Sequence, residues 1–120
     1  MNDAAKVLSL CENKKIKGYT TPVIIANAYY LLRKTAKQEV VIGKLNQLLN
    51  LIDVVKMDRK VVLKALNADF KDFEDALQNF SAVNKGEIKI ILTRNIKDFK
   101  RSELAILTPE TYLKARSVSN

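Results

Sequence analysis

The sequence predicts an α/β fold in which a parallel sheet of about four strands has helices on both faces, a three-layer α/β/α arrangement. One observation is that short apolar runs alternate with longer segments of helical periodicity. Another is that Thr21-Pro22 and Thr108-Pro109 have the pattern of a helix start, with a capping residue followed by proline. Strands that are separated by helices connect in parallel. Because parallel sheets bind ligands at the carboxyl ends of their strands, the residues just after Thr20 and Thr93 are candidates for a site.

The expected elements follow one another without a linker, a repeat or a low-complexity segment. In chain order we expect a helix at 3–12, a strand at 16–20, helices at 23–32 and 38–51, a strand at 52–57, helices at 58–66 and 69–84, strands at 88–93 and 104–107, and a helix at 109–116. The helix at 23–32 is apolar almost all round and is expected to be buried. The chain is long enough for one domain over residues 1–120, but too short for two.

Composition excludes several kinds of chemistry. The chain has no His and one Cys, which excludes the usual zinc sites, Ser-His-Asp catalysis and Cys-His catalysis. Its 21 Lys and Arg residues against 13 Asp and Glu residues give a net charge of +8, which favours a polyanionic partner such as nucleic acid. No apolar run is long enough to cross a bilayer and no secretory signal is recognisable, so we expect a cytoplasmic protein.

The segment DFKDFEDALQ at residues 69–78 concentrates acidic residues in a basic chain, with four acids within residues 69–75. Asp69 and Asp72 fit a solvated helix start, where acids offset the macrodipole. Asp75 lies at the edge of an apolar stripe, so we expect it to be half buried and to need a partner. That stripe, with three- and four-residue spacing, consists of Phe70, Phe73, Leu77 and Phe80.

A second polar segment, TRNIKDF at residues 93–99, follows the clearest strand. Taken alone it is a turn, in which Asn and Asp supply loop geometry. At the carboxyl end of a parallel strand, Asn95 and Asp98 would instead face the same crevice as Asp75. Oxygen ligands that converge there from separate segments would suit Mg²⁺ or Mn²⁺.

These two segments, in this order, resemble the PIN domain family, in particular the PIN-like nucleases related to VapC-type toxins. The similarity extends to GYTTPVIIANAYYLLRK at residues 18–34 and LTPETYL at residues 107–113, and it covers essentially the whole chain. The resemblance implies a metal-dependent nuclease that cleaves the phosphodiester bonds of single-stranded RNA. It also implies a toxin of a toxin–antitoxin pair, with a cognate antitoxin and a homodimer as expected partners.

The resemblance also implies a set of metal ligands for one or two Mg²⁺ or Mn²⁺ ions. Asp75 would be the best ligand and a catalytic residue, with Asp98 and Asn95 beside it. Asp72 and Glu74 would be next in line as ligands. Such an ion would lower the pKa of a bound water and neutralise charge that builds up on the phosphate.

Two further groups complete the predicted site. Asn27 occupies the position where many PIN domains carry an acidic ligand, and its alternative role is a buried amide that ties helix to loop. Arg94 is expected to meet a phosphate. The basic residues expected to bind the RNA strand are Arg94, Lys97, Lys100 and Arg101.

The chain departs from the family at the first strand. PIN domains open with a central strand that carries an Asp-Thr-Asn motif, and the Asp is a principal metal ligand, whereas this chain begins with the helix at 3–12. We therefore expect an N-terminally truncated PIN-like domain without its central first strand, which would leave strand edges exposed. The alternative to a ribonuclease is a non-catalytic domain that binds nucleic acid or protein. A phosphate-transfer enzyme of another family is disfavoured because no Gly-rich loop follows a strand.

Overall fold

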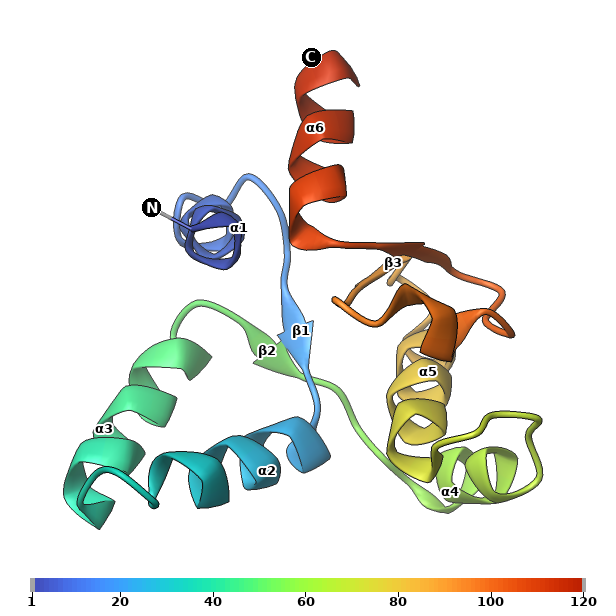
Figure 1. The fold of residues 1–120 in the computed structure, drawn as a ribbon, viewed down its shortest axis with the longest axis horizontal. Coiled ribbons are helices and arrows are strands. Elements are labelled where there is room, and N and C mark those ends of the chain that lie inside the picture. Colours follow the sequence, from blue (N-terminus) through green and yellow to red (C-terminus); the bar gives the residue numbers. More distant parts are fainter. Residues whose placement is uncertain (1, 120) are drawn as a thin grey trace. The chain divides into compact units, whose positions relative to one another are not determined.

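A computed structural model of the protein describes residues 2–119. Figure 1 shows the chain order, which is α1 (Asp3–Glu12), β1 (Tyr19–Thr20), α2 (Pro22–Leu32), α3 (Gln38–Leu49), β2 (Asp53–Val54), α4 (Arg59–Leu66), α5 (Phe73–Lys85), β3 (Ile90–Leu92), the 3₁₀ helix η1 (Ile96–Phe99), β4 (Ala105–Leu107) and α6 (Pro109–Ser119). The α/β class and the predicted order of helices and strands are confirmed, and η1 is an addition. No helix within the described residues is long and apolar enough to cross a membrane.

The chain divides into two compact units. One unit is Leu8–Lys56 and holds β1, α2, α3 and β2. The other consists of the residues up to Val7 together with everything from Met57 onward, and it holds α4, α5, β3, η1, β4 and α6. Helix α1 contributes residues to both. A single domain over residues 1–120 stays a prediction.

The strands are parallel, as the sequence predicts, but they are shorter and pair differently. They form two two-stranded sheets, β1 with β2 and β3 with β4, instead of one sheet of about four strands. Each of the described strands therefore has one hydrogen-bonded neighbour. The paired residues are Tyr19 with Asp53, Thr20 with Val54, Ile90 with Ala105, Ile91 with Ile106, and Leu92 with Leu107.

One edge of β3 is open. The Thr93 N–H donates to the Leu107 carbonyl at 3.0 Å. The backbone N–H and C=O groups of the odd-numbered residues in this strand therefore point toward β4. The backbone groups of Ile90 and Leu92 consequently point to the opposite edge. In the part of the chain that the structure describes, no strand pairs with that edge.

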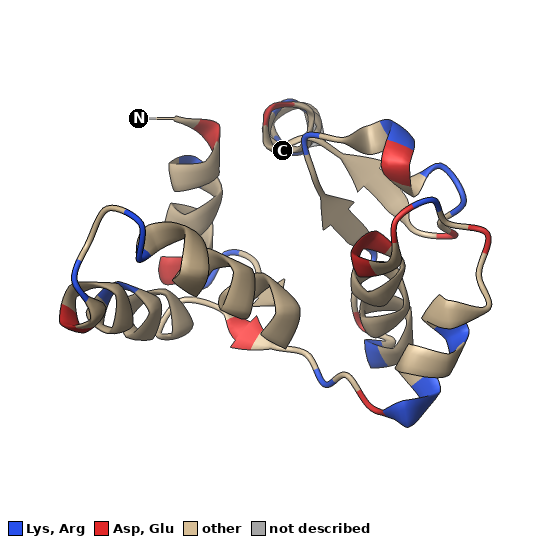
Figure 2. Ribbon diagram, turned by 60° about the horizontal axis from the view of Figure 1, so that its bottom comes forward, with Lys and Arg blue, Asp and Glu red and all other residues tan. Residues whose placement is uncertain are grey.

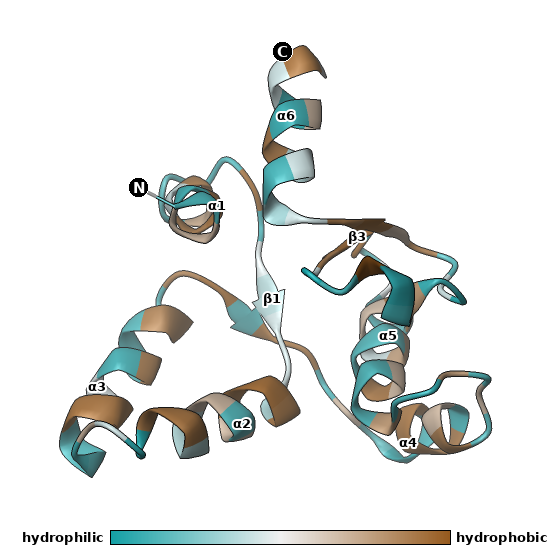
Figure 3. Cartoon of the chain, viewed as in Figure 1, coloured by the Kyte–Doolittle hydropathy of each residue, from teal (hydrophilic) through white to brown (hydrophobic). Residues whose placement is uncertain are grey.

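Helix α2 is capped as predicted but is not buried. The Thr21 hydroxyl accepts the Ile24 N–H at 3.2 Å, and Pro22 is the first helical residue. The prediction of a buried helix is wrong, because no residue of α2 is buried and Ile24, Tyr30 and Leu31 are 44%, 70% and 65% exposed. A helix that is apolar all round needs neighbours on several sides, and the main neighbour of α2 is α3 alone. Figure 3 shows brown, apolar segments along both helices.

Helix α5 is the most buried helix of the unit that begins at Met57. It packs mainly against α4 and also contacts η1. Phe70 lies in the loop before it, with its ring 5.9 Å from that of Phe80 and 6.2 Å from that of the buried Phe99. Phe73, predicted to lie in the buried stripe, is exposed because it begins the helix. The buried residues of α5 are Ala76, Leu77, Asn79, Ser81 and Ala82.

Gly18 lies at a close packing contact in the Leu8–Lys56 unit. A Cβ atom at this position would lie 2.7 Å from Cys11 Sγ and 2.8 Å from Ile52 Cγ2. Cys11 is buried, and burial raises the pKa of its thiol, so this side chain packs as a small apolar group. The approach of the α1 end to the segment before β2 therefore requires a residue without a side chain.

We predict that Gly18→Ala lowers the free energy of unfolding by roughly 1–3 kcal/mol, because the added methyl group overpacks this contact. Urea denaturation followed by circular dichroism measures the change. Gly43→Ala is the matched control, because a Cβ there meets nothing within 4 Å and should gain up to about 0.5–1 kcal/mol inside a helix. Equal stability of the two variants would contradict the packing argument.

Candidate functional site

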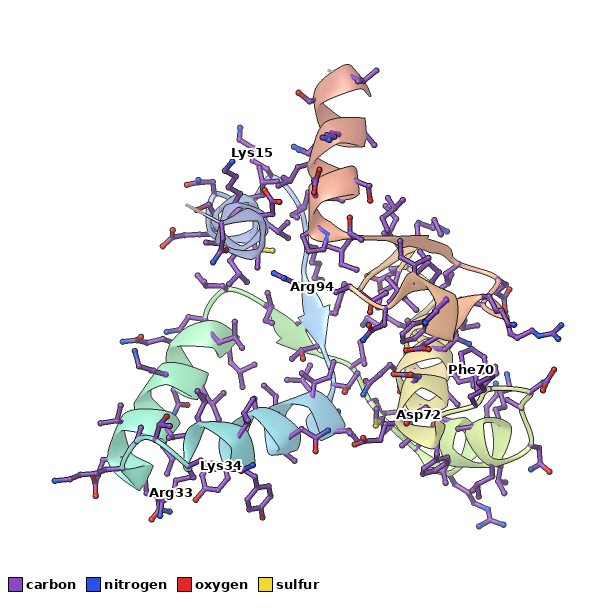
Figure 4. All side chains as sticks on the ribbon, viewed as in Figure 1. Lys15, Arg33, Lys34, Phe70, Asp72 and Arg94 are labelled. Carbon is purple, nitrogen blue, oxygen red and sulfur yellow. The ribbon has the colours of Figure 1, made fainter. Side chains whose placement is uncertain are left out.

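The start of α5 brings acidic side chains together. Asp72 is the N-cap, and its carboxylate accepts the Asp75 N–H at 2.9 Å. Because the helix begins at Phe73, Glu74 and Asp75 both fall in its first turn, where acids interact favourably with the macrodipole. Figure 4 labels Asp72 at this helix start. The carboxylate of Asp72 is thus engaged in a hydrogen bond to the helix backbone.

Asp75 is the described carboxyl group whose pKa is raised by its surroundings. Burial raises the pKa of Asp75, and the negative charges of Asp72, Asp98 and Glu74 raise it further, in that order. Asp98 comes from η1, so the structure brings the two polar segments of the sequence near each other. Like charges held this close favour a bound cation or a proton.

The turn after β3 positions Asp98. The Asn95 N–H donates to the Thr93 hydroxyl at 3.0 Å, and the Asp98 N–H donates to the Asn95 carbonyl at 3.0 Å. The side chain of Asn95 does not cap η1, and both Asn95 and Arg94 are exposed. Figure 2 shows basic and acidic segments next to each other on η1. The backbone of Asn95, more than its side chain, therefore sets the position of Asp98.

The donor chemistry suits a hard divalent ion, but the set is incomplete. Carboxylate oxygens are the ligands that Mg²⁺ and Mn²⁺ prefer. Among residues 2–119, however, no three His, Cys, Asp or Glu side chains form a group able to hold a metal ion. Asn27 is exposed on α2, in the Leu8–Lys56 unit, so the alternative of a buried amide is wrong. The described residues do not form a metal site by themselves.

A cavity of about 160 Å³ adjoins the acidic cluster. Asp98 belongs to its wall and is also close enough to Asp75 to raise the pKa of that residue. Three of the predicted RNA-binding residues line it, whereas Arg94 does not. The lining residues are Asp69, Phe70, Lys71, Lys97, Asp98, Lys100 and Arg101.

Sequence reasoning missed the roles of Lys71 and Asp69. Lys71 lines the cavity, and the signal for it is a single base inside an acidic segment. Asp69, expected to serve the helix start, instead forms an ion pair with Arg101 at 3.4 Å. The side chains of Arg101 and Asp69 are 62% and 86% exposed, so this pair is worth little for stability.

In this mixed α/β chain, a helix start and the turn after a parallel strand bring carboxylates together. A family profile described as PIN domain matches residues 1–97. The chain therefore belongs to the PIN domain family. No curated protein and no solved structure matches the chain.

We predict that Asp72→Ala lowers the free energy of unfolding by about 0.5–2 kcal/mol, because the Asp75 N–H loses its cap. Relief of repulsion with Asp75 offsets part of this loss. Asp72→Asn is the matched control, since Asn caps as well as Asp. Thermal denaturation without divalent metal measures both variants, and equal loss in both would show that the cap is unimportant.

We predict that Asp75→Asn is more stable than the wild type in metal-free buffer at neutral pH. A carboxyl with a pKa raised by folding destabilises the folded state once it ionises, and Asn cannot ionise. The gain should stay below about 1 kcal/mol because Asp75 is partly exposed.

The gain should also shrink as the pH falls below the ordinary Asp range, where Asp75 is protonated in both states. Thermal melts over a pH series measure this. The exposed Glu103→Gln serves as the control for loss of one negative charge. A variant less stable than the wild type at neutral pH would contradict the crowding of charges at Asp75.

Proposed function

We propose that this PIN domain is a Mg²⁺- or Mn²⁺-dependent endoribonuclease that cleaves single-stranded RNA and acts as the toxin of a toxin–antitoxin pair in the cytoplasm. The observation that carries the proposal is the crowding of carboxylates around Asp75 next to a cavity lined by basic residues. Carboxylates alone would repel RNA, and basic residues alone would only bind it. Their adjacency, in a chain of net charge +8, suits the binding and hydrolysis of a polyanion.

Each residue of the proposed site has a role set by its chemistry. Asp75 and Asp98 supply carboxylate oxygens for one or two divalent ions, with Asn95 as a neutral oxygen donor nearby. When bound, the metal supplies a water of lowered pKa and neutralises charge on the phosphate. Further proposed ligands are Asp72, Glu74 and Asn27. The residues proposed to hold the RNA backbone are Arg94, Lys97, Lys100 and Arg101.

The second candidate function is a non-catalytic domain that binds nucleic acid or a protein partner. The observation that favours it is that the described carboxylates do not form a complete metal-binding group. In that case the basic cavity would keep its affinity for RNA while cleavage would be lost.

We further propose that the protein forms a homodimer. Large apolar side chains on α2 and α3, two helices that contact each other, are exposed, and association is one way to cover such side chains. These side chains are Ile24, Tyr30, Leu31, Val40, Ile42 and Leu49. A cognate antitoxin is the other proposed protein partner.

We predict that the protein cleaves single-stranded RNA with Mn²⁺ or Mg²⁺ and that chelation with EDTA stops cleavage. Asp75→Asn should lower the rate by at least about 100-fold, the effect of removing one group that stabilises transition-state charge. Gel analysis of a labelled RNA measures the rate, and Glu103→Gln controls for loss of an unrelated acid.

Cleavage that continues in EDTA, or in Asp75→Asn, would contradict this mechanism. RNA that binds but stays intact with every divalent ion would favour the non-catalytic function.

A further inference from the structure

The cavity next to the acidic cluster has an excess of positive charge. Its wall holds four basic and two acidic side chains. Arg101 is paired with Asp69, whereas Lys71, Lys97 and Lys100 form no ion pair within residues 2–119. Cations from two separate segments that converge on one cavity repel each other, and the two acids of the wall leave a net excess of two positive charges. A bound anion would remove this repulsion.

The size of the cavity restricts the ligand. Pockets for whole small molecules have volumes of about 300–1,000 Å³, and this one has about 160 Å³. It therefore suits one phosphate with part of its sugar, as one link of a longer chain. Phe70 supplies an apolar wall for the sugar, and Phe80 and Phe99 hold its ring.

We propose that this cavity is a subsite for a backbone phosphate of single-stranded RNA, next to the phosphodiester at the acidic cluster, and that Asp69 occupies Arg101 until the phosphate displaces it. Asp98 links the two places, because it lines the cavity and lies near Asp75. The exposed ion pair at 3.4 Å is weak enough to exchange for a phosphate. The choice of RNA as the anion rests on the proposed function.

Fluorescence anisotropy with a labelled single-stranded RNA in EDTA tests the subsite without cleavage. Lys71→Ala and Arg101→Ala should each weaken binding about fivefold or more. Each should also reduce the slope of log affinity against log salt by about 0.7, as expected for one lost phosphate contact. Lys64→Ala, an exposed lysine outside the cavity, is the matched control and should change affinity less than twofold.

The role of Asp69 has its own test. Asp69→Asn should tighten binding more than the control Glu103→Gln does, because it frees Arg101 as well as removing a negative charge. In the Arg101→Ala background the gain should fall to that of the control. A gain that is equal in both backgrounds, or no larger than that of Glu103→Gln, would overturn the proposed exchange at Arg101.

Other outcomes decide the remaining parts. A morpholino oligomer of the same sequence, which lacks phosphate charge, should bind at least about tenfold more weakly, and equal binding would overturn a phosphate subsite. No RNA binding by the wild type, or unchanged binding by Lys71→Ala and Arg101→Ala, would do the same.

Metal-dependent cleavage that persists with unchanged binding would retain the nuclease and reject the subsite. Weakened binding without any cleavage would retain the subsite and reject the nuclease. Thermal melts confirm that each variant is folded.

Discussion

The hydrogen bond from the Asp75 N–H to the Asp72 carboxylate fixes where α5 begins, and the candidate site depends on that start. Because a helix turns every 3.6 residues, the start sets which side chains of α5 face inward. It places Ala76 at 0% exposure and Asp75 at the border of the buried face. The Asp72 carboxylate also lies close enough to that of Asp75 for its negative charge to raise the pKa of Asp75. One side chain thus satisfies a helix end and adds to the like-charge crowding that a cation would relieve.

Helix α5 carries a second unfavourable feature further along. The amide oxygen of Asn79 and the hydroxyl of Ser81 are buried and have no hydrogen-bond partner among the described residues. Each unsatisfied buried group costs about 1–3 kcal/mol. Asn79 follows Asp75 by one turn, so both lie on one side of the helix. Proteins keep such unfavourable groups mainly where function requires them. Selection for stability alone therefore does not explain the polar residues on this side of α5.

Local chemistry made the order of elements predictable. Thr21 and Asp58 cap helices, and Gly86, with a φ of 85°, ends α5, all as their residue types indicate. Strand pairing was not predictable in detail, because it depends on contacts between residues far apart in the chain. The prediction that α2 is buried was wrong for the same reason. An apolar sequence shows that a helix would gain free energy by packing against neighbours, but it does not show whether the fold supplies those neighbours.

The acidic segment shows how far residue types can predict a site. The predicted helix start at residue 69 was four residues too early, because Asp72 is the N-cap and Asp75 lies in the first turn of α5. The ion pair of Asp69 could not be predicted, because its partner Arg101 is distant in the sequence and the fold brings the two together. The three acids therefore do different things: Asp69 pairs with Arg101, Asp72 caps the helix, and Asp75 has a pKa raised by burial and by the acids around it. This difference in environment, more than the number of acids, distinguishes Asp75 from the other acids of the segment.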